Sequence, residues 1–121
     1  MRDRRAYFRI TLVLPLSIRM ETDTGDSVFI EQSVNISGGG IGFVAGTSYS
    51  PGNIITITLR LQAEVLFKAR AEVLRRDPLP HRPDGYRIHA RFIQMSEQER
   101  EALIGHIMRL QREHLHGHYS A

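Results

Sequence analysis

Two short polar motifs near the N-terminus contain the residue types in this chain that are best suited to binding chemistry. The first is R-x-x-x-R, formed by Arg5 and Arg9, with Arg4 directly before it. The second is N-x-S-x-x-G, which runs from Asn35 to Gly40. Arginine's planar fork pairs with phosphates and with the O6 and N7 acceptors of guanine, and its flat face stacks on rings. In an extended chain, arginines four residues apart are separated by about 13 Å, which suits opposite sides of one compact ligand.

The second motif supplies groups that arginine lacks. Asn35 has an amide oxygen that accepts hydrogen bonds, and Ser37 has a hydroxyl that can donate one. Gly38, Gly39 and Gly40 permit positive φ and a close approach of the backbone to a ligand, and successive N–H groups in such a turn can form an anion-binding nest. Taken alone, the arginine motif also fits a solvated N-terminal tail. The N-x-S-x-x-G motif taken alone also fits an ordinary tight turn.

The composition narrows the class of protein. The 121 residues suffice for one domain, and the net charge of +3 is too small to indicate a general DNA-binding protein. The chain has no cysteine, which excludes disulfides and thiolate metal sites and suits a reducing compartment. The longest apolar stretch, Ile10 to Ile18, is too short to span a bilayer, and no signal-peptide pattern opens the chain. We therefore expect a cytoplasmic protein without membrane insertion.

Apolar residues alternate along most of the chain, which predicts six short strands at 11–21, 28–34, 41–45, 55–61, 65–75 and 86–92. Pro15 indicates an edge or a bulge in the first strand, and the longest loop is expected from Asp77 to Gly85, which contains three prolines. Ser96 and Glu99 form a capping box, followed by apolar residues at helical spacing. This order predicts a closed or nearly closed antiparallel barrel with one C-terminal helix.

Other kinds of function have weaker support. Four histidines, His106, His114, His116 and His118, are not arranged as a fixed metal site, and no metal is expected. The aromatic fraction of 7% without tryptophan disfavours a barrel that binds single-stranded nucleic acid, which needs several exposed stacking platforms. No Ser/His/Asp set or pair of acids can be assigned to one site, so no catalytic residue and no enzyme activity are expected.

Both motifs, in this order and followed by a β-rich run and a C-terminal helix, resemble the PilZ domain family of cyclic diguanylate receptors. The resemblance implies a six-stranded antiparallel PilZ-type barrel plus the C-terminal helix at residues 10–115, a flexible Arg-rich arm at 1–9 and a disordered tail at 116–121. It implies that cyclic diguanylate is the ligand, with no cofactor. The ligand-binding residues it implies are Arg4, Arg5, Arg9, Asn35, Ser37, Gly38, Gly39 and Gly40.

The resemblance also suggests how the domain signals. Binding would order the arm against the turn and so change contacts with an unidentified protein partner. Arg4 occupies the position that influences whether one ligand or an intercalated pair is held. The family more often has aspartate at the position of Asn35 and glycine at that of His89. The alternative is a PilZ-like interaction adaptor that does not bind the nucleotide. Such an adaptor normally lacks one of the two motifs, whereas this chain has both.

Overall fold

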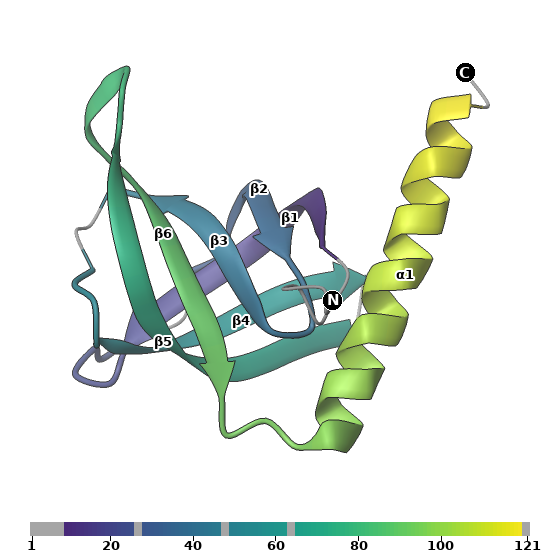
Figure 1. Ribbon diagram of the computed structural model, residues 1–121, viewed down its shortest axis with the longest axis horizontal. Coiled ribbons are helices and arrows are strands. Elements are labelled where there is room, and N and C mark those ends of the chain that lie inside the picture. The colour runs from purple at the N-terminus through teal and green to yellow at the C-terminus, as the bar shows by residue number, and fades with distance from the viewer. Residues whose placement is uncertain (1–8, 26–27, 47–48, 63–64, 120–121) are drawn as a thin grey trace, which may run out of the picture.

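Six antiparallel strands close into a barrel, and one helix follows them (Figure 1). The computed structural model describes residues 9–25, 28–46, 49–62 and 65–119. The elements are β1 (Ile10–Met20), β2 (Ile30–Ile36), β3 (Gly40–Ala45), β4 (Ile54–Gln62), β5 (Val65–Leu79), β6 (Arg82–Ile93) and α1 (Glu97–Tyr119). Around the barrel the strands follow the order β1-β2-β3-β6-β5-β4. The predicted fold class, a mainly β six-stranded barrel with a C-terminal helix, is confirmed.

The barrel interior is filled by the apolar half of each alternating strand. In β4, for example, Ile55, Ile57 and Leu59 are fully buried, while Thr56 and Thr58 between them are only partly buried. Burying one such side chain contributes about 1.5–3 kcal/mol. The helix joins the same core through Leu103 and Ile107, which lie four residues apart on one helical face. The hydrophobic pattern therefore places α1 against the barrel.

Pro15 lies where β1 has a partner on one side only. It pairs with Glu31 of β2, whereas the ladder between β1 and β4 begins at Leu16. Proline lacks the N–H that a second neighbour would need, so an edge-like position suits it. Of the two expectations for Pro15, the edge is the one observed.

The prediction of a long loop from Asp77 to Gly85 was wrong. Strand β5 continues to Leu79 and β6 begins at Arg82, so these strands form a long hairpin that projects from the barrel (Figure 1). Pro78 pairs with Tyr86, and the register shifts directly after it. Cross-strand pairing, together with the Arg76 guanidinium 5.9 Å from the Tyr86 ring centroid, therefore outweighs the local preference of the prolines for a loop.

The start of α1 follows the predicted capping box. Glu99 N–H donates to Ser96 Oγ at 3.0 Å, and Ser96 N–H donates to Glu99 Oε1 at 2.9 Å. The pKa of Glu99 is lowered because its carboxylate accepts hydrogen bonds from Ser96, first from the backbone N–H and then from the side chain. The helix runs to Tyr119, so residues 116–119, which were expected in a tail, are helical. Within the described residues, α1 is not apolar enough along its length to cross a membrane.

Candidate functional site

The N-x-S-x-x-G motif forms the turn between β2 and β3, and four hydrogen bonds hold that turn. Ser37 N–H donates to the Gly40 carbonyl at 3.0 Å, and Gly39 N–H donates to Ser37 Oγ at 3.1 Å. Phe92 N–H of β6 donates to the Gly39 carbonyl at 3.0 Å. The fourth bond comes from Arg100 of α1, whose Nη1 donates to the Gly38 carbonyl at 2.7 Å. The motif is therefore an ordered turn tied to a neighbouring strand and to the helix.

Gly40 is required for close backbone packing and not for an unusual φ. A Cβ at this position would overlap the Ala90 carbonyl oxygen and would lie 3.2 Å from Arg91 Cα. Among the described residues, the glycines with positive φ are Gly25 and Gly52, both in other turns. The expectation that the glycines of the motif would use positive φ is therefore not met. The value of Gly40 is the absence of a side chain where backbone segments meet.

Asn35 is the last outward-facing residue of β2, because the alternate residues Val34 and Ile36 point into the core. It is paired with Thr11 of β1 and Gly42 of β3. Its Nδ2 donates to Thr11 Oγ1 at 3.1 Å, and among the described residues no donor reaches its Oδ1. The site therefore presents an amide oxygen on the outer surface of the barrel.

Ser37, unlike Asn35, is buried. Only 6% of its surface is exposed, and its Oγ already accepts the Gly39 N–H. A hydroxyl that accepts one bond still has one proton to donate. The clearest role of Ser37 in the described structure is to order the turn.

Arg9 lies next to the turn because antiparallel β1 begins beside the residue at which β2 ends. Ile10 pairs with Ile36, so Arg9, which directly precedes Ile10, comes alongside the beginning of the Ser37–Gly40 turn. The residue is exposed. Arg4 and Arg5 lie outside the described residues. The structure thus brings together Arg9, Asn35 and the turn, and the contribution of Arg4 and Arg5 stays a prediction.

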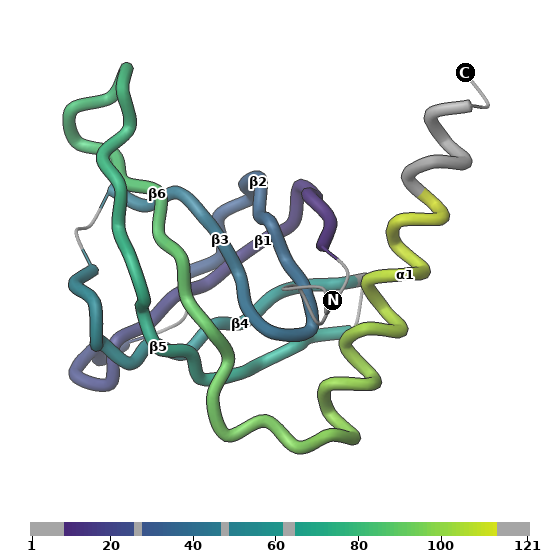
Figure 2. The backbone as a smooth tube through the Cα atoms, in the orientation of Figure 1, coloured from purple at the N-terminus to yellow at the C-terminus, as the bar shows by residue number. Residues whose placement is uncertain are grey.

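Arg100 is a residue of this region that the sequence analysis missed. Its side chain is 18% exposed and lies on the first turn of α1, with Nε 3.5 Å from Glu97 Oε1. Cations are disfavoured at a helix N-terminus, because the helix dipole is positive there. An arginine at this position was therefore a signal that the side chain has another partner. Figure 2 traces the turn beside this part of α1.

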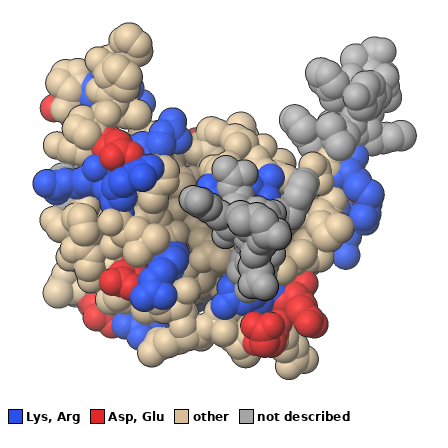
Figure 3. All heavy atoms as spheres, in the orientation of Figure 1, with Lys and Arg blue, Asp and Glu red and all other residues tan. Residues whose placement is uncertain are grey.

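A second cation lies beside the turn, and its charge is compensated. Arg91 pairs with Gly40 in the β3–β6 ladder, and its Nη2 and Nε contact Glu72 Oε1 at 2.7 and 3.1 Å. The first turn of α1 carries the acids Glu97 and Glu99. Figure 3 shows acidic and basic side chains side by side at this end of the helix.

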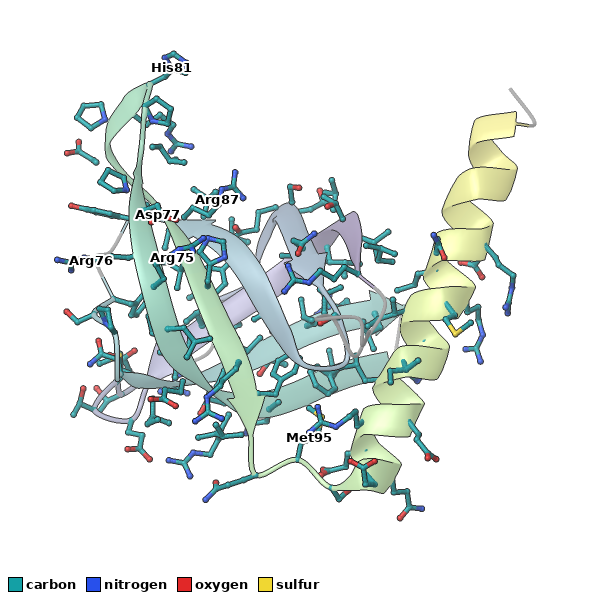
Figure 4. The ribbon with its side chains drawn as sticks, viewed as in Figure 1. Arg75, Arg76, Asp77, His81, Arg87 and Met95 are labelled. Carbon is teal, nitrogen blue, oxygen red and sulfur yellow. The ribbon has the colours of Figure 1, made fainter. Side chains whose placement is uncertain are left out.

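A separate polar cluster lies on the β5–β6 hairpin (Figure 4). Arg75 Nη2 is 3.3 Å from His89 Nε2, and Asp77 Oδ2 is 3.1 Å from Arg75 Nε and 3.4 Å from His89 Nε2. Burial lowers the pKa of His89, and the neighbouring Arg75 and Arg87 lower it further against the opposing effect of Asp77. No group of His, Cys, Asp or Glu among the described residues could hold a metal ion.

Comparison with known proteins identifies the family. The sequence matches the PilZ domain over residues 3–109, so the chain belongs to the PilZ domain family. Domains of this family act as receptors and adaptors and are generally not enzymes. No curated protein matches the sequence significantly.

Solved PilZ structures share the fold over most of this chain. The inhibitor of motility MotI/DgrA from Bacillus subtilis has 26% identity and a TM-score of 0.69, with 92% of this chain and 52% of that chain covered. YcgR from Escherichia coli, solved in complex with c-di-GMP, has 22% identity and a TM-score of 0.72, with coverage of 98% and 50%. The chain thus spans about half the length of these two proteins.

A third solved structure shares the fold and is described as an assembly. A pathogenic protein from Xanthomonas campestris, described as a tetrameric PilZ domain self-assembled through a helical bundle, has 15% identity and a TM-score of 0.75. The match covers 91% of both chains. At this identity the likeness concerns the fold.

Proposed function

We propose that this chain is a bacterial receptor for cyclic diguanylate (c-di-GMP), which binds on the outer surface of the barrel at the β2–β3 turn. The observation that supports the proposal is that Arg9, the second arginine of the first motif, and the second motif lie at one end of a PilZ barrel. Arg9 precedes β1 where β1 pairs with the end of β2, and the Asn35–Gly40 motif begins at that same end. The c-di-GMP complex of the related YcgR supports the choice of ligand.

The proposed contacts follow from the chemistry of the ligand. Arg5 and Arg9 pair with the phosphates and with the O6 and N7 edge of guanine, since charge-assisted bonds of this kind are short and strong. Asn35 Oδ1, which has no donor among the described residues, accepts from guanine N1–H or N2–H₂. Gly38, Gly39 and Gly40 allow the ligand to approach the backbone. Ser37 holds the turn and has one hydroxyl proton to donate to the ligand.

We further propose that Arg4 allows an intercalated pair of ligands to bind. A stacked pair brings four phosphates and four guanines, which two arginines cannot all contact. A third guanidinium supplies a counter-charge and a flat stacking surface. Calorimetry should give two ligands per wild-type chain and a lower value for Arg4→Leu, and a stoichiometry of one for both proteins would contradict this role.

The proposed output is an ordering of residues 1–9 on binding, which changes the surface available to a downstream protein partner. A cytoplasmic location is part of the same proposal, because the ligand is an intracellular messenger. Backbone ¹⁵N relaxation of Arg9 and the preceding residues tests it. Relaxation that is equally restricted with and without ligand would contradict signalling through the arm.

Chemical-shift mapping tests the location of the site. Addition of c-di-GMP should shift the backbone amides of Asn35 to Gly40 and the Nδ2 signals of Asn35, while amides near the tip of the β5–β6 hairpin serve as an internal control. Shifts confined to the hairpin would place the ligand elsewhere. An absence of shifts at saturating ligand would favour the alternative, a PilZ adaptor that recognises a protein without the nucleotide.

A further inference from the structure

The peptide unit between Gly38 and Gly39 is held at both ends. Its carbonyl oxygen accepts a hydrogen bond from Arg100 Nη1 at 2.7 Å, and its N–H donates to Ser37 Oγ at 3.1 Å. Because both groups belong to one planar unit, rotation of this peptide would break both bonds together. Arg100 and Ser37 therefore act on the same element of the turn.

The hydrogen bond from Arg100 to this turn comes from a side chain that is distant in the sequence. The Gly39 and Gly40 carbonyls accept from the backbone N–H groups of Phe92 and Ser37, which no side-chain substitution removes. The Gly38 carbonyl accepts instead from a residue 62 positions away in the sequence. The Arg100 side chain is 18% exposed, and its hydrogen bond of 2.7 Å to the Gly38 carbonyl is a strong, charge-assisted contact.

The place of Arg100 in α1 is not explained by helix stability. The helix dipole disfavours a cation in the first turn, where Arg100 Nε lies 3.5 Å from Glu97 Oε1. Arg109 lies farther along the same helix and is exposed. The capping box at Ser96 and Glu99 fixes the helix start, so Arg100 reaches the turn from an anchored backbone.

We propose that Arg100 is a positioning residue for the nucleotide site. By holding the Gly38–Gly39 peptide, it keeps Ser37 and the glycine backbone in the arrangement that receives the ligand, and it links that arrangement to α1. This inference rests on the proposed function, because it concerns the same site. Pre-organisation of this kind increases affinity by removing the cost of ordering the turn on binding.

The first test compares two arginine variants of one helix. Arg100→Met should weaken c-di-GMP binding by about tenfold, the loss typical of one charged hydrogen bond, whereas Arg109→Met should bind like the wild type. In the free protein, Arg100→Met should also accelerate exchange of the Gly39 amide hydrogen with water, and Arg109→Met should not. A purely structural role of Arg100 in the helix would leave Gly39 exchange unchanged.

A double-mutant cycle tests the shared peptide. Because Ser37 and Arg100 hold opposite ends of one unit, the affinity lost in Ser37→Ala/Arg100→Met should be smaller than the product of the two single losses. Losses that multiply would contradict a joint action. Arg100→Lys, which keeps the charge without the planar fork, should show intermediate affinity and intermediate Gly39 exchange. Wild-type Gly39 exchange in Arg100→Lys would contradict the proposal even if Arg100→Met does not fold.

The outcomes separate this inference from the proposed function. If the wild-type chain does not bind c-di-GMP, the proposed function fails and the positioning role fails with it. If the wild type binds and Arg100→Met binds equally well, the positioning role alone is overturned. Reduced affinity together with faster Gly39 exchange supports both.

Discussion

Asn35 and Thr11 lie opposite each other on β2 and β1, and Asn35 Nδ2 donates a hydrogen bond to Thr11 Oγ1 over 3.1 Å. This bond fixes the plane of the amide at the outer surface of the barrel. The amide oxygen is then available for a ligand, since no donor among the described residues reaches it. Thr11 was not part of the predicted site, and its role became visible only from the strand register.

Substitutions of Asn35 should change affinity in opposite directions. Asn35→Ala removes the acceptor and should weaken c-di-GMP binding by about 1 kcal/mol or more. Asn35→Asp should strengthen it, because a carboxylate accepts from guanine N1–H and N2–H₂ more strongly than an amide, and the Thr11 hydroxyl can then act as donor. Calorimetry measures both variants. Tighter binding by Asn35→Ala than by Asn35→Asp would contradict the proposed contact.

Removing either arginine of the R-x-x-x-R motif should weaken binding strongly. Arg5→Ala and Arg9→Ala should each cost at least ~2 kcal/mol of binding free energy, because each removes a charged hydrogen-bonding group. Arg87→Ala, an exposed arginine on the β5–β6 hairpin, is the matched control and should bind like the wild type. Equal losses in all three variants would indicate general electrostatic attraction in place of a defined site.

Gly40→Ala should destabilise the protein, because the new methyl group would overlap the Ala90 carbonyl oxygen. Overpacking of this kind costs about 1–3 kcal/mol in the free energy of unfolding. Gly105→Ala is the control, because it lies within α1 with no atom near the added methyl group, and it should stabilise by about 0.5–1 kcal/mol. Urea unfolding compares the two, and a wild-type midpoint for Gly40→Ala would show that the turn can move away from β6.

His89 should make stability depend on pH. Its pKa is lowered from 6.5, first by burial and then by Arg75, so the unfolded chain binds this proton more readily than the folded chain. The contribution of neutral His89 is complete above pH 6.5 and is lost as the pH falls below that value through the folded-state pKa. His89→Gln should reduce the difference in unfolding midpoint between pH of about 5 and about 8. An unchanged difference would assign the pH dependence to other groups.

The strands and the helix could largely be predicted from residue alternation, since periodicity reports which face of each strand is buried. One exception was the hairpin at Asp77–Gly85, where the prolines indicated a loop. The long pairing of β5 with β6 accommodates Pro78 and Pro83 within the strands. Such pairing depends on residues of the partner strand, which local propensity does not include.

The candidate site could be predicted in part. The N-x-S-x-x-G residues formed a turn as expected, and Arg9 came alongside it. The reason for Gly40 could not be foreseen, because it depends on the backbone of β6. The place of Arg100 in the first turn of α1 was a signal, but its partner could not be foreseen, since only the packing of α1 beside the turn brings its guanidinium to Gly38. The sequence pattern therefore did not predict the contacts between segments that are distant in the chain.

The most direct test of the proposed function is calorimetric titration of the wild-type chain with c-di-GMP and, in parallel, with cyclic diadenylate. Adenine has an amino donor where guanine has O6, so an arginine fork that binds guanine would face a donor. The proposal predicts saturable binding of c-di-GMP and binding of cyclic diadenylate that is weaker by about 1–3 kcal/mol or more. No heat with c-di-GMP, or equal affinity for the two ligands, would contradict it.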